Sequence, residues 1–250
     1  ATQALVYFSL IPPFLGSDKI YATTFLALAI VALGASVLHL GRPAFSFRAF
    51  LGIRHSWLSR EIIAFAFFAK VAGLYAVTLW LEWDLPYLGL AAALFGGVGV
   101  LSSVMVYVAT QRPCWRPVIT GSKFIMTTVI LGLASTAALT LVLNPFNPDP
   151  ESLNQVRSEV LSFLLIPLMV ATAVKLIFEG SLLLSNAGIS KNTPLRRSAQ
   201  LMRGELRDIT VARFFFAILG GIALPGIYLL ICDHAELSST FLAIVIGLGF

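Results

Sequence analysis

The sequence predicts an all-α polytopic membrane protein, in which residues 1–250 form one integral membrane domain with a bundle of eight transmembrane helices. Hydrophobic residues make up 58% of the chain and charged residues 12%, about half the charged fraction of an ordinary globular domain. The apolar runs reach about 20 residues, the length that a helix needs to cross a hydrocarbon core of about 30 Å. Most charges lie between these runs.

The apolar runs are taken in chain order as eight spans. They cover residues 1–14, 21–40, 61–82, 86–109, 122–144, 159–184, 210–232 and 237–250. The first and the last are short, because fourteen helical residues cover only about 21 Å. We therefore expect both to be truncated helices of a longer chain. Pro225 should disturb the seventh span, because it leaves a backbone carbonyl without its donor.

The basic residues gather in alternating connections. Of the 17 Lys and Arg, 11 lie between spans two and three, four and five, or six and seven, and Lys123 and Arg213 lie just inside the spans that follow two of these connections. The positive-inside rule then places these three connections on the cytoplasmic side of the inner (plasma) membrane. A second interpretation, compatible with the first, is that some of these arginines dock a partner protein.

Two further patterns concern packing and lipid contact. Residues 193–209 read as a surface helix with Pro194 in its first turn and one apolar face, which is typical of contact with membrane lipid. In the fourth span, Gly99 and Ser103 are four residues apart. Such small-residue spacing predicts close packing of two helices.

His39 and Glu61 are the first candidates for chemistry. His39 ends the second span and Glu61 begins the third, so both are expected at the basic membrane face. A histidine titrates near neutral pH, and a carboxylate can be tuned to do so, which suits proton exchange with a quinone. The structural alternative is an interfacial histidine beside a glutamate that favours the positive end of its helix.

Aromatic residues are expected on the same face. The connection between spans four and five places Tyr107 and Trp115 beside Arg112 and Arg116. These rings could stack against the flat ring of a quinone. They could equally belong to the aromatic belt that membrane proteins carry at the interface.

Charges inside the spans raise an alternative function. Lys70 lies inside the third span, and Lys175 lies one helical turn before Glu179 in the sixth. Intramembrane charges are costly and by default suggest function, so an ion or proton transporter is the rival hypothesis. A static Lys175–Glu179 pair is the simpler interpretation, and the internal symmetry of many transporters is not visible.

Several classes of function are disfavoured. The sequence has no CxxC motif, no nucleotide-binding glycine loop and only three histidines, of which His234 is expected on the opposite face. We expect no haem, no metal site, no nucleic-acid partner and no catalytic residue for substrate chemistry. If the protein handles electrons, another subunit must supply them.

Two segments resemble the membrane-anchor subunits of the dimethyl sulfoxide reductase family. They are "LHLGRP…RAF…SWLSREI", within residues 36–62, and more loosely "YVATQRPCWRP", within 105–121. The resemblance implies a quinone-site histidine at His39 and a carboxylate at Glu61. It departs from the family at Arg60, where some members have Asn, and in lacking a Glu-and-Arg segment of the last helix.

The resemblance also implies partners. A molybdopterin subunit would perform the substrate chemistry, and a four-cluster iron–sulfur subunit would dock on the anchor. The anchor would exchange electrons with menaquinone or ubiquinone, as in anaerobic respiration, without haem of its own. The substrate, sulfoxide or sulfite, stays open, as does the direction of electron flow. The face that receives the iron–sulfur subunit would contain Arg42, Arg48, Arg54, Arg60, Arg112 and Arg116.

Overall fold

The computed structural model describes residues 17–38, 51–83, 85, 87–112, 115–143, 161–187 and 194–231. Regular structure in these ranges is helical throughout, which confirms the all-α prediction. Six helices of the described part are long and apolar enough to cross a membrane. The expected spans at residues 1–14 and 237–250 lie outside the described residues, so the count of eight stays a prediction.

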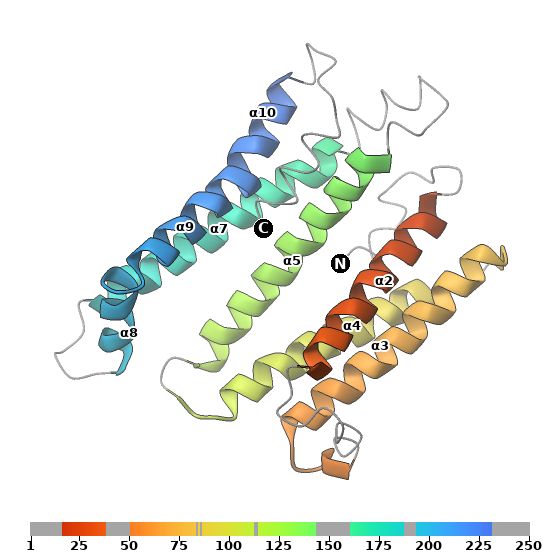
Figure 1. Ribbon diagram of the computed structural model, residues 1–250, viewed down its shortest axis with the longest axis horizontal. Coiled ribbons are helices and arrows are strands. Elements are labelled where there is room, and N and C mark those ends of the chain that lie inside the picture. Colours follow the sequence, from red (N-terminus) through yellow and green to blue (C-terminus); the bar gives the residue numbers. More distant parts are fainter. Residues whose placement is uncertain are drawn as a thin grey trace. The chain divides into compact units, whose positions relative to one another are not determined.

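The chain divides into two compact units, Ala1–Phe124 and Ile125–Phe250. In the first unit, α2 (Ser17–Leu38), α3 (Trp57–Trp80) and α4 (Tyr87–Val108) pack side by side (Figure 1). Lys19, at the start of α2, pairs with Glu82, just after α3, at 3.0 Å. These two helices are therefore antiparallel.

The α3–α4 contact is close because α4 presents glycines to aromatic side chains of α3. A Cβ at Gly89 would lie 3.2 Å from the ring of Tyr75, and one at Gly99 would lie 2.6 Å from the ring of Phe65. Close approach through small residues drives helix packing in lipid. The two contacts also fix an antiparallel register, in which the start of α3 faces the end of α4.

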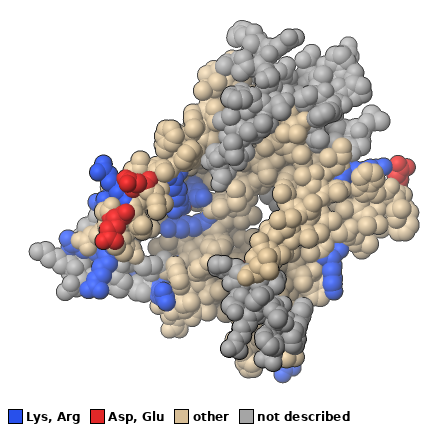
Figure 2. Space-filling model, viewed as in Figure 1, with Lys and Arg blue, Asp and Glu red and all other residues tan. Residues whose placement is uncertain are grey.

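The second unit contains α7 (Leu161–Ala187), α8 (Pro194–Arg203), α9 (Arg207–Ile218), the π-turn η4 (Leu219–Ala223) and α10 (Leu224–Ile231). It also holds most of α5 (Pro117–Leu143), which begins with the proline that suits a first helical position. On the face drawn in Figure 2, charged side chains of this unit gather over α8 and the start of α9.

The proline of the last described span is accommodated by local widening of the helix. The π-turn η4 ends two residues before Pro225, and the backbone N–H of Leu224 donates to the carbonyl of Leu219, five residues earlier. A proline inside a helix removes one backbone donor and crowds the preceding turn. The chain thus stays helical from Arg207 to Ile231 instead of breaking.

The surface helix is shorter than the sequence predicted. α8 ends at Arg203, and a turn at 204–206 separates it from α9, so residues 193–209 are not one helix. The N–H of Gly204 donates to the carbonyl of Gln200 at 2.8 Å, which closes the last turn. A Cβ at this position would lie 3.1 Å from the carbonyl oxygen of Gln200. Ala199 is buried, whereas Ile209 is exposed.

Candidate functional site

The first unit places a carboxylate against a serine at the end where the basic connections lie. α3 begins at its N-cap Ser56, whose hydroxyl accepts from the N–H of Ser59 at 3.4 Å. Glu61 follows in the second turn and faces α4. The hydroxyl of Ser103 donates to Oε1 of Glu61 in a short hydrogen bond. The close α3–α4 packing brings these two side chains together.

Ser103 has a second acceptor within reach. Its Oγ lies 3.2 Å from the carbonyl oxygen of Gly99, one turn earlier on α4. A serine hydroxyl carries one hydrogen and can also accept. When Glu61 is ionised, Ser103 donates to the carboxylate. When Glu61 is protonated, its own O–H can donate to Ser103, which then donates to Gly99. The hydrogen bond between Ser103 and Glu61 can therefore form whether the carboxyl group is ionised or protonated.

Aromatic rings lie one helical turn from this pair. Tyr107 follows Ser103 by four residues, so the two share a face of α4. The ring of Tyr107 lies 5.0 Å from Trp115 at an interplanar angle of 80°, and 5.5 Å from Phe124. Two of the predicted site residues, Tyr107 and Trp115, are therefore in direct contact.

The described arginines of this region differ in their surroundings. Arg60 donates to the carbonyl oxygens of Ile53 at 2.9 Å and Arg54 at 3.0 Å, and its guanidinium lies 4.2 Å from the ring of Trp57. These contacts hold the turn before α3. Arg112 lies over Trp115 at 5.0 Å. The side chains of Arg54, Arg112 and Arg116 are exposed.

Three predicted residues of the site, His39, Arg42 and Arg48, lie outside the described residues. Sequence reasoning interpreted Ser103 only as a packing residue and did not single out Thr120. Thr120 is 5% exposed, and its hydroxyl has no hydrogen-bond partner in the part of the chain that the structure describes. It lies one turn before Phe124, which contacts Tyr107. A pair formed by a serine of one helix and a carboxylate of another cannot be predicted until the register between the two helices is known.

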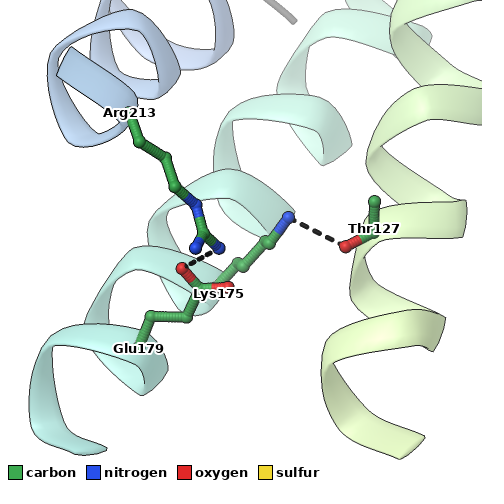
Figure 3. Close-up of polar contacts among 4 residues, drawn as sticks. All are labelled: Thr127, Lys175, Glu179 and Arg213. Carbon is green, nitrogen blue, oxygen red and sulfur yellow. Dashed lines mark hydrogen bonds and ion pairs between the residues drawn. The ribbon is translucent and has the colours of Figure 1, made fainter. Parts of the chain in front are cut away.

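The charged residues of the second unit make cross-helix contacts (Figure 3). Glu179 of α7 pairs with Arg213 of α9 at 2.5 Å, and Nζ of Lys175 donates to Thr127 of α5 at 2.9 Å. The spacing of Lys175 and Glu179 predicted a pair within one helix, but the ion pair of Glu179 that the structure shows is with another helix. In the first unit, Lys70 lies 5.9 Å from the ring of Phe67.

Comparison with known proteins identifies the family. The family model described as "DMSO reductase anchor subunit (DmsC)" matches residues 15–246. The chain belongs to this family. The match confirms the resemblance seen in the sequence, and with the six apolar helices it makes the protein a multi-pass membrane protein. Among the described residues, no group of three metal-binding side chains is found.

Two curated relatives are 32% identical to this protein. One is a sulfite dehydrogenase subunit of Allochromatium vinosum, matched over 152 residues, 54% of this protein and 46% of the relative. The other is an anaerobic dimethyl sulfoxide reductase subunit of Haemophilus influenzae, matched over 133 residues, 48% of this protein and 45% of the relative. The match thus spans less than half the length of either relative. No solved structure matches significantly.

Proposed function

We propose that this DmsC-family protein is the membrane-anchor subunit of a molybdopterin and iron–sulfur oxidoreductase complex, and that it exchanges electrons and protons with membrane quinone beside Glu61. The observation that carries this proposal is the contact between Glu61 and Ser103, because Ser103 can donate to the ionised carboxylate or accept from the protonated one. Such a pair can take up and release a proton without leaving a buried polar group unpaired.

The chemistry of a quinone needs that property. Oxidation of a quinol releases two electrons and two protons, and reduction of a quinone takes them up. In this proposal the electrons pass to or from the iron–sulfur clusters of a partner subunit. Glu61 accepts or gives one proton at a quinone oxygen, and His39 serves the other, as the family resemblance implies. A general acid or base must lie within hydrogen-bond reach of the oxygen, directly or through one water.

The aromatic residues fit the ring of the quinone. Tyr107 and Trp115 contact each other edge to face, and Tyr107 shares a helix face with Ser103. In our proposal these rings flank the quinone, and the hydroxyl of Thr120 supplies a further hydrogen bond. Aromatic pairs in offset or edge-to-face geometry contribute about 0.5–1.5 kcal/mol beyond the area that they bury. No haem is needed in this subunit, so its purified form should lack a haem absorption band.

Docking of the iron–sulfur subunit is assigned to the basic connections. Arg54, Arg112 and Arg116 are exposed, and Arg42 and Arg48 are proposed to extend the same surface. Arg60 is bound to the turn before α3, so we give it a supporting role at this surface. The basic connections then face the cytoplasm. Labelling of Arg54→Cys by an impermeant reagent from outside intact cells would contradict that orientation.

The relatives suggest two substrates for the catalytic subunit, because one relative is named for sulfite dehydrogenase and the other for dimethyl sulfoxide reductase. Sulfite and a sulfoxide are therefore both candidate substrates of the complex that we propose. Purification of the complex, with identification of the copurified polypeptides and their metals, distinguishes this function from an ion or proton transporter that works alone.

The site is tested by a paired assay on membranes that hold the whole complex. Glu61→Gln and His39→Ala should each lower quinone-linked turnover by about 100- to 10,000-fold, the usual contribution of a general acid or base. Turnover with a soluble dye that bypasses quinone should persist. The control is Glu82→Gln, which removes a carboxylate outside the spans. Full quinone-linked activity in Glu61→Gln, or loss of both activities together, would rule out this role of Glu61.

A further inference from the structure

The second unit contains a cavity that the proposed quinone chemistry does not use. Its volume is about 210 Å³, and residues of α5, α7 and α9 line it. One part of its lining is apolar and includes Phe214 and Phe216. The other part carries four polar side chains, and they are Thr172, Lys175, Glu179 and Arg213.

The polar residues lie along one face of α7 and extend into the membrane span. Thr172, Lys175 and Glu179 follow each other at intervals of three and four residues, which is one helix face. Glu179 lies eight residues before the end of α7, about 12 Å inside it at 1.5 Å per residue. Thr172 lies at the middle of the span Leu161–Leu184. The cavity therefore extends from near the end of α7 that leads into α8 to about the middle of the membrane span of α7.

Two polar atoms at this cavity are buried without a hydrogen-bond partner among the described residues. They are Oε1 of Glu179 and Oγ1 of Thr172. The other carboxylate oxygen of Glu179 is held by Arg213, whose side chain is 56% exposed, whereas that of Glu179 is 8% exposed. Leaving a buried polar atom unsatisfied costs about 1–3 kcal/mol, and more for a charged group. A donor other than those of the described residues is therefore needed at Oε1.

The polar side chains that line the cavity indicate which kind of molecule can occupy it. An anion would face the unsatisfied oxygen of Glu179, and a cation would face both Lys175 and Arg213. Water both donates and accepts, so it can serve Glu179 and Thr172 at once. A water molecule takes about 30 Å³ in the liquid and needs two to four polar partners, so the cavity has room for several. Arg213 lies near the start of the span Arg207–Leu230, so its guanidinium marks the end of the cavity nearer the membrane surface, from which water can enter.

We propose that this cavity is a water-filled inlet, which admits water and hydrated protons from the α8 end of the second unit to the middle of the membrane. The Glu179–Arg213 pair forms its mouth and Thr172 its inner end. Arg213 supplies the opposite charge to the carboxylate of Glu179, and in this proposal protons move along the waters of the inlet. This inlet goes beyond the proposed quinone site and does not depend on it.

Thiol chemistry tests the inlet, because a methanethiosulfonate reagent reacts with the thiolate, and a thiol ionises poorly in dry apolar surroundings. Thr172→Cys and the control Thr136→Cys are made in the full-length protein, within its membranes, after Cys114→Ser and Cys232→Ser. Thr136 is fully buried on α5, does not line the cavity and donates to the carbonyl of Gly132 at 2.7 Å. Burial raises the pKa of a thiol, and a rise of one unit in that pKa lowers the fraction of thiolate about tenfold.

The thiol of Thr172→Cys should react with a water-soluble methanethiosulfonate at least about tenfold faster than the thiol of Thr136→Cys. Its rate should also rise about tenfold per pH unit below the pKa of the thiol, because protons exchange with the bulk. Ala217→Cys, on the α9 side of the cavity, provides a second probe if Thr172→Cys fails to fold. Equal rates at 172 and 136, or a rate independent of pH, would show a closed, dry cavity and overturn the proposal. Slowing by an added short-chain quinol would also overturn it and assign the cavity to a quinol.

Discussion

Glu61 in the first unit and Glu179 in the second both lie inside membrane spans, and the two carboxylates are held in different ways. Glu61 of the first unit is hydrogen-bonded to a neutral serine, Ser103. Glu179 of the second unit is paired with the guanidinium of Arg213. Protonation of Glu61 breaks no ion pair, whereas protonation of Glu179 would leave Arg213 without its counter-charge.

This difference separates two uses of a carboxylate inside a membrane span. A group that exchanges protons with a substrate needs a partner that tolerates both of its charge states, and a hydroxyl does so because it donates and accepts. A group that stays ionised needs a fixed opposite charge, because an isolated charge in a low-dielectric region is costly. The first arrangement fits the proposed quinone site, and the second fits the proposed inlet.

The largest stability effect is expected where the fixed pair is broken. Arg213→Leu leaves Glu179 buried without its cation, and breaking a fully buried pair costs about 3–5 kcal/mol. Because Arg213 is 56% exposed, we expect a smaller loss of about 2–3 kcal/mol after screening by solvent. The double variant Arg213→Leu with Glu179→Leu should recover most of this loss. Unfolding in detergent measures it, and an additive double variant would mean that the two charges are independent.

Removing the hydrogen bond between Ser103 and Glu61 in the first unit should lower quinone-linked turnover. Ser103→Ala removes a hydrogen bond to a charged group, which is worth about 1.5–3 kcal/mol, so quinone-linked turnover should fall by about 10- to 100-fold. Dye-linked turnover should be unaffected. Ser102→Ala is the matched control, since Ser102 is also buried on α4 but points elsewhere on the helix. An equal loss in both variants would mean that the effect comes from packing.

The glycine that admits this contact should be the next most sensitive. Gly99→Ala would place a Cβ 2.6 Å from the ring of Phe65, and such overpacking typically costs about 1–3 kcal/mol. It should also reduce quinone-linked turnover by moving Ser103 away from Glu61. Gly97→Ala is the control, because no atom lies within 4 Å of its Cβ. If Gly99→Ala is as stable and active as Gly97→Ala, the close approach is not needed.

The smallest effect concerns a carboxylate outside the spans, which serves as a reference for the other two. The hydrogen bond and charge of Lys19 lower the pKa of Glu82 below its ordinary value of 4.5. A lowered folded-state pKa stabilises the protein above the ordinary value, and this stability is lost as the pH falls through the folded-state pKa. Thermal unfolding of Lys19→Met should therefore lack a small pH-dependent component that the unsubstituted protein loses as the pH falls below 4.5. An unchanged pH profile would show that the contact contributes nothing.

Much of this protein follows from local sequence pattern. Runs of apolar residues identified the six described spans because each helix must satisfy its own backbone hydrogen bonds in lipid. The segments within residues 36–62 and 105–121 pointed to the family that the comparison confirmed. Tyr107 and Trp115 were placed together correctly because they lie close to each other along the chain.

The sequence by itself therefore determined the helical class, the six described spans and the family, because these depend on composition and on neighbours along the chain. The tertiary structure decided which charges and hydroxyls meet. Ser103 reaches Glu61, and Arg213 reaches Glu179, across helix pairs whose register is set by side-chain packing. The surface helix ended at Arg203, where the apolar periodicity alone predicted its continuation to residue 209. Contacts between helices depend on rotation and register about each axis, which a periodic pattern in one segment does not specify.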